Sequence, residues 1–164
     1  MKALEVANFF IELDQLNGNY EMTNMRVNKL LYFAQGWSLA LKGKPLFEDS
    51  IEAWEHGPVV NEIYQAFKPC GNNAIYDTVG DFDLESFSSD DVEFLSSVYY
   101  NYVRYSTSEL RNITHIKGSP WDKTYQNGNG RNKQITNESI KTYFDSEKKI
   151  QTFDDFVRSI PYAD

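Results

Sequence analysis

The stretch that decides the fold is residues 23–43, TNMRVNKLLYFAQGWSLALKG. Apolar residues recur there at the three- and four-residue spacing of a helix face. Thr23 is a typical N-cap residue, and Gly43, with Pro45 just beyond it, ends the pattern. Because aromatic side chains also lie around the sides, we expect a central helix over residues 24–42 that packs on more than one side. Its expected buried face comprises Val27, Leu30, Leu31, Ala34, Trp37, Ser38 and Leu41.

Further helices are predicted on both sides of this segment. Ser88 and Thr136 are typical N-cap residues, and Ser106 with Glu109 has the spacing of a capping box. Pro58 follows Gly57 and is suited to the first position of a helix. The segments with apolar residues at helical spacing are 3–16, 58–67, 88–103, 106–113 and 136–144. We expect Phe10, Tyr64, Leu95 and Tyr99 from these helices to join the buried core.

The remaining segments predict little regular structure. Residues 51–54 alternate as a short extended piece, and residues 75–79 are a weak strand candidate. Residues 117–134, rich in Gly, Asn and Lys, predict a long loop. The expected fold is therefore mainly α: a single compact helical domain with one or two short β segments over residues 1–147. An amphipathic tail follows over residues 148–164, in which Thr152 and Asp155 resemble a capping pair.

The charge of the chain favours some partners over others. The formal net charge of −8 argues against nonspecific binding to nucleic acid, which requires Lys and Arg against phosphates. Residues 76–103 contain seven acidic residues and no Lys or Arg, whereas residues 117–133 are basic. A basic partner would be steered towards the acidic stretch, although a solvated face would have the same composition.

Targeting and disulfide signals are missing from the sequence. Cys70 is the only cysteine, so an internal disulfide is excluded. The first residues lack the pattern of a signal peptide, and no apolar run reaches the length of a membrane span. We therefore expect a cytoplasmic protein with no membrane partner.

The sequence contains no recognisable catalytic or metal-binding motif. His56 and His115 could perform acid–base chemistry, but two histidines and one cysteine are too few for a soft-ligand metal site. A structural role is open to each: His56 could hydrogen-bond a turn, and a protonated His115 could lie at the negative end of a short helix. We expect no metal ion and no cofactor. A small hydrolase or nucleotide-binding enzyme that uses both histidines and the 117–133 loop remains an alternative.

An ordered series of blocks resembles the Panacea domain family, which includes the SocA-like antitoxins and the phage-associated GepA-like proteins. The blocks span about residues 4–144 and include residues 30–37 (LLYFAQGW), 44–47 (KPLF), 51–54 (IEAW) and 57–60 (GPVV). In the second half they include Leu110, Thr114-His115, Pro120-Trp121 and residues 140–144, and residues 116–118 (IKG) depart from the family pattern. The positions that match the family motifs are Tyr32, Gln35, Trp37, Trp54, Gly57, Pro58, Val59, His115, Pro120 and Trp121.

The resemblance implies a mostly helical antitoxin that neutralises a cognate toxin by direct binding. It also implies an alternative, a proteolytic adaptor that delivers its toxin to a bacterial protease. Antitoxins in general often bind DNA to regulate their own expression, but this chain shows no added helix-turn-helix or basic arm, so we do not expect it to bind nucleic acid by itself.

Two further expectations concern surfaces. Aromatic residues make up 15% of the chain, and rings that lie off a buried face are candidates for anchoring a partner protein. The candidate partner-binding residues are Tyr100, Tyr105, Phe153, Phe156, Asp90, Asp91 and Glu93. We also expect residues 54–59 to form a rigid strand-to-helix corner that packs against Pro120 and Trp121, because both segments pair an indole with a constrained backbone.

Overall fold

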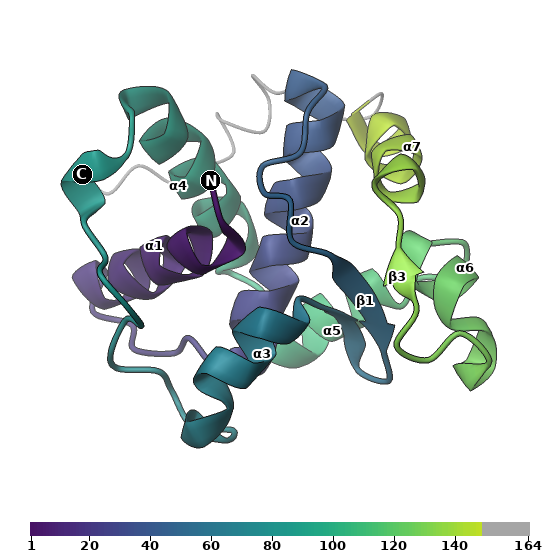
Figure 1. Cartoon of the computed structure of the whole chain (residues 1–164), viewed down its shortest axis with the longest axis horizontal. Helices are drawn as coiled ribbons and strands as arrows, with labels where there is room; N and C mark the ends of the chain where they lie inside the picture. The colour runs from purple at the N-terminus through teal and green to yellow at the C-terminus, as the bar shows by residue number, and fades with distance from the viewer. Residues whose placement is uncertain (149–164) are drawn as a thin grey trace.

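The predicted central helix is present. The computed structural model describes residues 1–148, and its helix α2 (Asn24–Lys42) runs through the middle of the molecule (Figure 1). Every residue from Arg26 to Ala40 is buried, so no side of this part of the helix faces solvent. The Thr23 hydroxyl accepts a hydrogen bond from the Arg26 amide, and Gly43 ends the helix in the left-handed conformation.

Other helices surround α2 and confirm the mainly α fold. α1, α3, α4, α5 and α7 all contact α2 directly. Predicted caps are confirmed at Ser88, whose hydroxyl accepts from the Asp91 amide, and at the Ser106–Glu109 capping box. The surrounding helices are α1 (Ala3–Leu16), α3 (Asn61–Phe67), α4 (Ser89–Tyr102), α5 (Thr107–Thr114), α6 (Pro120–Tyr125) and α7 (Asn137–Lys148). Short 3₁₀ turns cover Lys68–Cys70, Leu84–Ser86 and Gln126–Gly128.

A small antiparallel sheet lies beside the amino-terminal half of α2. Its strands within residues 1–148 are β1 (Ile51–Trp54), β2 (Gly57–Val59) and β3 (Gln134–Ile135), in the order β2-β1-β3. The prediction that Pro58 begins a helix is wrong. Pro58 pairs with Ala53 across the β1–β2 hairpin, and α3 begins only at Asn61. A proline is tolerated there because β2 is an edge strand, where one amide need not serve the ladder.

The second predicted strand, residues 75–79, does not form. Ile75 instead donates its amide to the carbonyl oxygen of Met22, and the amide and carbonyl of Val79 bond to the side chain of Asn8. The Gln15 side chain also bonds to the carbonyl of Tyr76. The segment is thus held in extended form along α1 by side chains of that helix rather than by another strand.

The predicted loop over residues 117–134 is largely structured. Ser119 caps α6, and Pro120 occupies its first turn. The rest of the segment reaches the sheet, where the Asn132 amide donates to the Ala53 carbonyl and the Ala53 amide donates to the Lys133 carbonyl. The prediction failed because a six-residue helix shows too little apolar periodicity to stand out in a polar segment.

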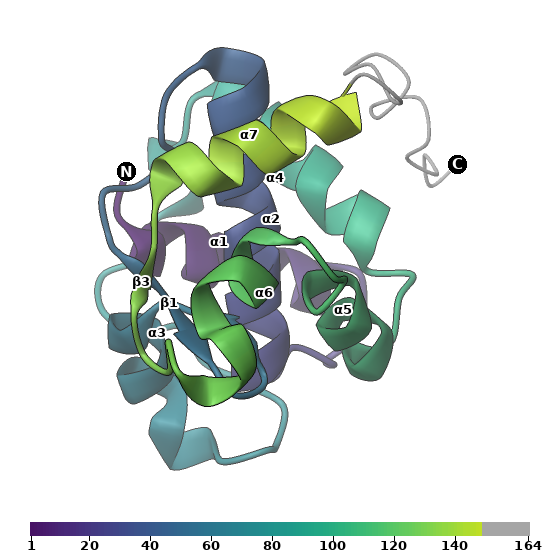
Figure 2. The same ribbon diagram turned by 90° about the vertical axis from the view of Figure 1, so that its right-hand side faces the viewer.

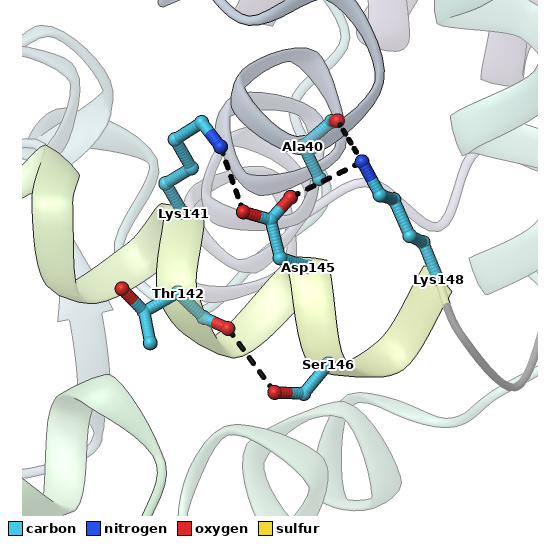
Figure 3. Close-up of polar contacts among 6 residues, drawn as sticks. All are labelled: Ala40, Lys141, Thr142, Asp145, Ser146 and Lys148. Atoms are coloured by element: carbon cyan, nitrogen blue, oxygen red, sulfur yellow. Dashed lines mark hydrogen bonds and ion pairs between the residues drawn. The ribbon is translucent and has the colours of Figure 1, made fainter.

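Helix α7 crosses α2 and completes the enclosure (Figure 2). Gly36 permits the close approach, since a Cβ added there would lie within 2.3–2.5 Å of the Phe144 ring. At the end of α7, the Lys148 ammonium donates a hydrogen bond to the carbonyl of Ala40 (Figure 3). The Asp145 carboxylate forms ion pairs with both Lys148 and Lys141. Hydrogen bonding from Lys141 lowers the pKa of Asp145 below its usual value.

The core is dominated by packed rings. The Trp37 indole donates to the hydroxyl of Tyr102 at 2.8 Å, and Phe33 stacks on Tyr102 with ring centroids 4.0 Å apart. The predicted burial of Leu30, Leu31, Ala34, Trp37, Phe10, Leu95 and Tyr99 is confirmed. The predicted burial of Tyr64 is wrong, since this ring is half-exposed and lines a pocket.

We predict that Trp37→Ala lowers the free energy of unfolding by about 3–5 kcal/mol, because the indole is 4% exposed and its removal leaves a cavity between α2, α4 and α7. Urea denaturation followed by circular dichroism measures this change. A loss below about 1 kcal/mol, typical of surface substitutions, would contradict the packing described here.

We predict that Gly36→Ala also destabilises the fold, by about 1–3 kcal/mol, because the new methyl group displaces the Phe144 ring. Helix propensity alone predicts the opposite sign, a gain of about 1 kcal/mol. A double-mutant cycle with Phe144→Leu, measured by thermal or urea denaturation, separates the two effects. Additive changes would show that the ring and the glycine do not interact.

Candidate functional site

One pocket lies where the start of α2, the β1–β2 hairpin and the end of α3 meet. Its volume is about 690 Å³, within the range of small-molecule sites. Half of the lining residues are exposed, whereas Asn24, Asn28, Lys29 and Val59 are buried. The other lining residues are Thr23, Met25, Trp54, Glu55, His56, Tyr64, Lys68, Gly71, Asn72, Thr107, Arg131 and Asn132.

Two asparagines one helical turn apart fix the wall of this pocket. The Asn28 side chain accepts from the amide of Val60 and donates to Asn24. The Asn24 side chain donates to the carbonyl of Tyr64 on α3. Because the side-chain amides of both asparagines form hydrogen bonds with backbone groups, they hold the hairpin and α3 against α2.

Lys29, next to these asparagines, is the unusual member of the site. The side chain is 1% exposed, and its Nζ has a single long contact, 3.5 Å to the carbonyl oxygen of Pro58. Burial lowers the pKa of Lys29 from 10.5 to about 7, and the positive charge of Arg111 acts in the same direction. A buried amine with three donor positions and no carboxylate partner among the described residues is rare in a structural role.

The hairpin backbone closes directly over this amine. Gly57 has φ +121°, and a Cβ added there would meet Lys29 Cε at 2.8 Å and Thr114 Oγ1 at 3.0 Å. The prediction that Gly57 permits an unusual backbone angle and a close approach is confirmed. The close approach is to Lys29, which the sequence did not single out.

The two histidines are near the same hairpin but have different surroundings. His56 is exposed at the turn and lines the pocket. His115 caps the end of α5, where Nδ1 lies 2.7 Å from the carbonyl oxygen of Arg111 and Nε2 lies 3.2 Å from that of Glu55. Burial lowers the pKa of His115, so its expected role as a helix-end cation is not favoured. Its ring nitrogens face backbone carbonyls and are poorly placed for acid–base catalysis.

The predicted contact between residues 54–59 and the Pro120–Trp121 block is confirmed. The Trp121 indole donates to the backbone carbonyl of Trp54 at 2.7 Å. The two indoles have different ring partners: Tyr64 contacts Trp54, whereas His115 and Tyr125 contact Trp121. The corner itself is a hairpin rather than the expected strand-to-helix junction.

The residues of α2 that were expected to match the family motifs are buried in the framework of the fold. Gln35 is buried, accepts from the amides of Leu46 and Phe47, and donates to the Phe47 carbonyl. The hydroxyl of Tyr32 is buried without a hydrogen-bond partner among the described residues, and burial raises its pKa well above 10. With Trp37, these residues hold the 44–47 segment, α4 and α7 around the central helix.

The candidate partner-binding residues are only partly on the surface. Tyr100 is half-buried and donates to the Asn17 side chain at 3.1 Å, and Tyr105 is half-buried beyond the end of α4 rather than on a helix. The acids at the start of α4 are better placed, with Asp90 and Glu93 exposed and Asp91 half-exposed. Phe153, Phe156 and the Thr152–Asp155 capping pair lie outside the described residues.

Three exposed large apolar side chains were not among the predicted candidates. Leu16 is 66% exposed, Tyr20 49% and Tyr76 64%. The rings of Tyr20 and Tyr76 are 6.0 Å apart, and Gln15 fixes the backbone of Tyr76. No helical pattern could reveal these residues, because they lie at a helix end and in two irregular segments.

Two further observations concern the described chain as a whole. Within residues 1–148, no group of three or more His, Cys, Asp and Glu side chains is arranged to hold a metal ion. None of the helices in the same range is long and apolar enough to span a lipid bilayer.

We predict that Lys29→Met stabilises the protein, and that the gain shrinks as pH rises. The pKa of Lys29 is about 7 when folded and near 10.5 when unfolded, so the unfolded chain binds more protons between these values. The stability of the wild type therefore rises with pH across that window. Below pH 7 the wild type bears the full penalty of a buried charge, which methionine removes.

Urea denaturation of both proteins between about pH 6 and pH 10 measures this effect. The difference between the two proteins isolates Lys29 from tyrosines that titrate at high pH. A difference that does not change with pH would contradict the buried state of the amine.

Comparison with known proteins places the chain in a family. The family model described as "Antitoxin SocA-like, Panacea domain" matches residues 27–122, which include α2, the hairpin and the start of α6. The chain is 33% identical to Antitoxin SocA from Caulobacter vibrioides (strain NA1000 / CB15N), over 77% of this chain and 74% of that protein. No solved structure matches. The protein thus belongs to the SocA-like antitoxins of the Panacea domain family.

Proposed function

We propose that this protein neutralises a separately encoded toxin by binding it directly. The observation that carries the proposal is the 33% identity to Antitoxin SocA over most of both chains. The matched region contains the central helix and the hairpin that organise the fold. A shared set of core elements supports a shared antitoxin role, but it does not identify the toxin.

The described residues favour protein binding over catalysis. Of the two histidines, only His56 lines the pocket, whereas both ring nitrogens of His115 face carbonyl oxygens. A hydrolase would need a nucleophile or an activated water beside a base. Such a set is not assembled around either histidine within residues 1–148.

We propose that the toxin contacts the Tyr20 surface, which comprises Leu16, Tyr20, Tyr76 and the adjoining ring of Tyr100. Tyr20 and Tyr76 lie against each other, and Tyr100 reaches the same helix end through Asn17. Exposed aromatic residues supply most of the binding energy in many protein interfaces. Such a cluster is also unusual on a surface with no partner.

Acidic residues follow this surface along the chain. The segment after Tyr76 contains Asp77, Asp81, Asp83 and Glu85, and all four are exposed. Asp90 and Glu93 continue the negative charge at the start of α4. Charges at the edge of an interface mainly raise the association rate, so they favour a toxin with a basic surface.

The test is co-expression of the chain with the product of the adjacent gene, scored by cell growth and by co-purification. Tyr20→Ala and Tyr76→Ala should abolish protection and binding, whereas Ile116→Ala, a matched control at an exposed site between α5 and α6, should not. All three should keep the wild-type circular dichroism spectrum. Protection that survives in the Tyr20,Tyr76 double variant would overturn the assignment of this surface.

The same experiment separates direct inhibition from delivery to a protease. Under direct inhibition the toxin persists at an unchanged level in a stable complex with this protein. A toxin that disappears in a protease-dependent way would instead show the proteolytic adaptor. Wild-type protein that neither binds nor protects would refute the antitoxin proposal.

Charge reversal of Asp90, Asp91 and Glu93 to Lys should slow association with the toxin and leave dissociation almost unchanged. The effect should be larger at low salt, because these charges are solvent-exposed and screened by ions. Surface plasmon resonance at two salt concentrations measures both rates. A change confined to the dissociation rate would place these residues inside the interface rather than at its edge.

A further inference from the structure

The pocket beside the hairpin has no role in the surface proposed for toxin binding. Its 690 Å³ could hold a small organic molecule, and it is lined by residues from α2, the hairpin, the end of α3 and the 131–132 segment. None of Leu16, Tyr20, Tyr76 or Tyr100 is among its lining residues.

The buried amine of Lys29 needs a partner that the described chain does not supply. Its one contact is the Pro58 carbonyl at 3.5 Å, beyond the usual length of a strong hydrogen bond. The charged group that acts on it, Arg111, has the same sign. An anion at this position would accept its hydrogen bonds and neutralise its charge, which is the arrangement that makes a buried charge stable.

The rest of the lining also suits an anion. Besides Lys29, the charged lining residues are Lys68 and Arg131 against the one acidic lining residue, Glu55, although the chain has a net charge of −8. The Arg131 guanidinium has a neutral partner, the Tyr125 hydroxyl at 3.3 Å, and so keeps its charge available. A local excess of positive charge in an acidic protein attracts anions to this pocket.

Two rings add a second recognition element. Trp54 and Tyr64 line the pocket with centroids 4.8 Å apart in an edge-on arrangement. The Trp54 indole N–H already donates to the Glu52 carboxylate, so this ring offers apolar surface rather than a donor. Such surface fits a flat or apolar molecular body.

We propose that this pocket binds a small organic oxyanion, with a carboxylate or phosphate group at Lys29 and a flat body against Trp54 and Tyr64. Binding of this kind is independent of toxin neutralisation and can be tested on the purified full chain. Because the amine is partly neutral near pH 7, an anion that binds at higher pH must draw a proton to Lys29.

The probes are benzoate, which has only the anionic group and a ring, adenosine monophosphate, which has a phosphate and a base, and inorganic phosphate. Each is titrated against the full chain at constant ionic strength, with chloride as the control anion. Binding is followed by chemical-shift changes in two-dimensional NMR spectra and by calorimetry. We compare the wild type with Lys29→Met and with Lys117→Met, an exposed lysine outside the pocket lining.

The proposal expects saturable binding of benzoate or adenosine monophosphate by the wild type and by Lys117→Met, with shifts at Trp54 and Tyr64. Lys29→Met should bind at least about tenfold more weakly while it stays folded. At about pH 8 the calorimetric heat for benzoate should depend on the buffer, with uptake of up to about one proton per site. Lys29→Met should lose this proton uptake.

Three results would overturn the proposal. One is the absence of saturable binding by the wild type for all three probes up to about 10 mM. Another is binding by Lys29→Met that equals the wild type. The third is binding with no proton uptake at about pH 8, which would place the anion away from the buried amine. None of these results bears on whether the protein neutralises a toxin.

Discussion

The complete burial of α2 is the constraint on which the rest of the structure depends. In a helix that is enclosed from Arg26 to Ala40, a polar side chain left without an internal partner is costly. Asn28 binds the backbone at the start of α3, and Gln35 binds the backbone of residues 46–47. Each partner is an irregular segment whose amides and carbonyls would otherwise be unsatisfied. The polar residues of the helix therefore determine the paths of the connections around it.

The elements that could be predicted from the sequence are those governed by local chemistry. The bounds of α2 follow from Thr23, Gly43 and a regular apolar pattern, while the Ser88 N-cap and the Ser106–Glu109 capping box locate the starts of α4 and α5. The hairpin at Pro58 was missed because a Gly-Pro pair suits a helix start and an edge strand equally well. Pairing with Ala53 and the approach of Gly57 to Lys29 decide between them, and both are tertiary contacts.

The sequence indicates the candidate pocket less clearly than it indicates the helices. A lysine in a helix normally lies on a solvated face, so Lys29 attracts no notice in a periodic pattern. The burial of Lys29 could have been predicted only indirectly. A helix with aromatic rings on all sides has no solvated face, so a charged side chain within it must be buried. The exposure of Tyr20 and Tyr76 could not be predicted either, although aromatic side chains are usually buried. Their exposure depends on how residues 75–79 lie along α1, which the side chains of Asn8 and Gln15 determine.

The positions expected from the sequence to match the family motifs are mostly inside the fold, and this limits what family membership says about the partner. Tyr32, Gln35, Trp37 and Trp121 are buried and hold helices, a loop and the hairpin together. A chain can keep such a framework while its exposed residues change freely, since exposed positions contribute little to stability. We propose that the choice of toxin resides in exposed side chains, which in this chain are the rings of the Tyr20 surface and the acidic segment that follows it.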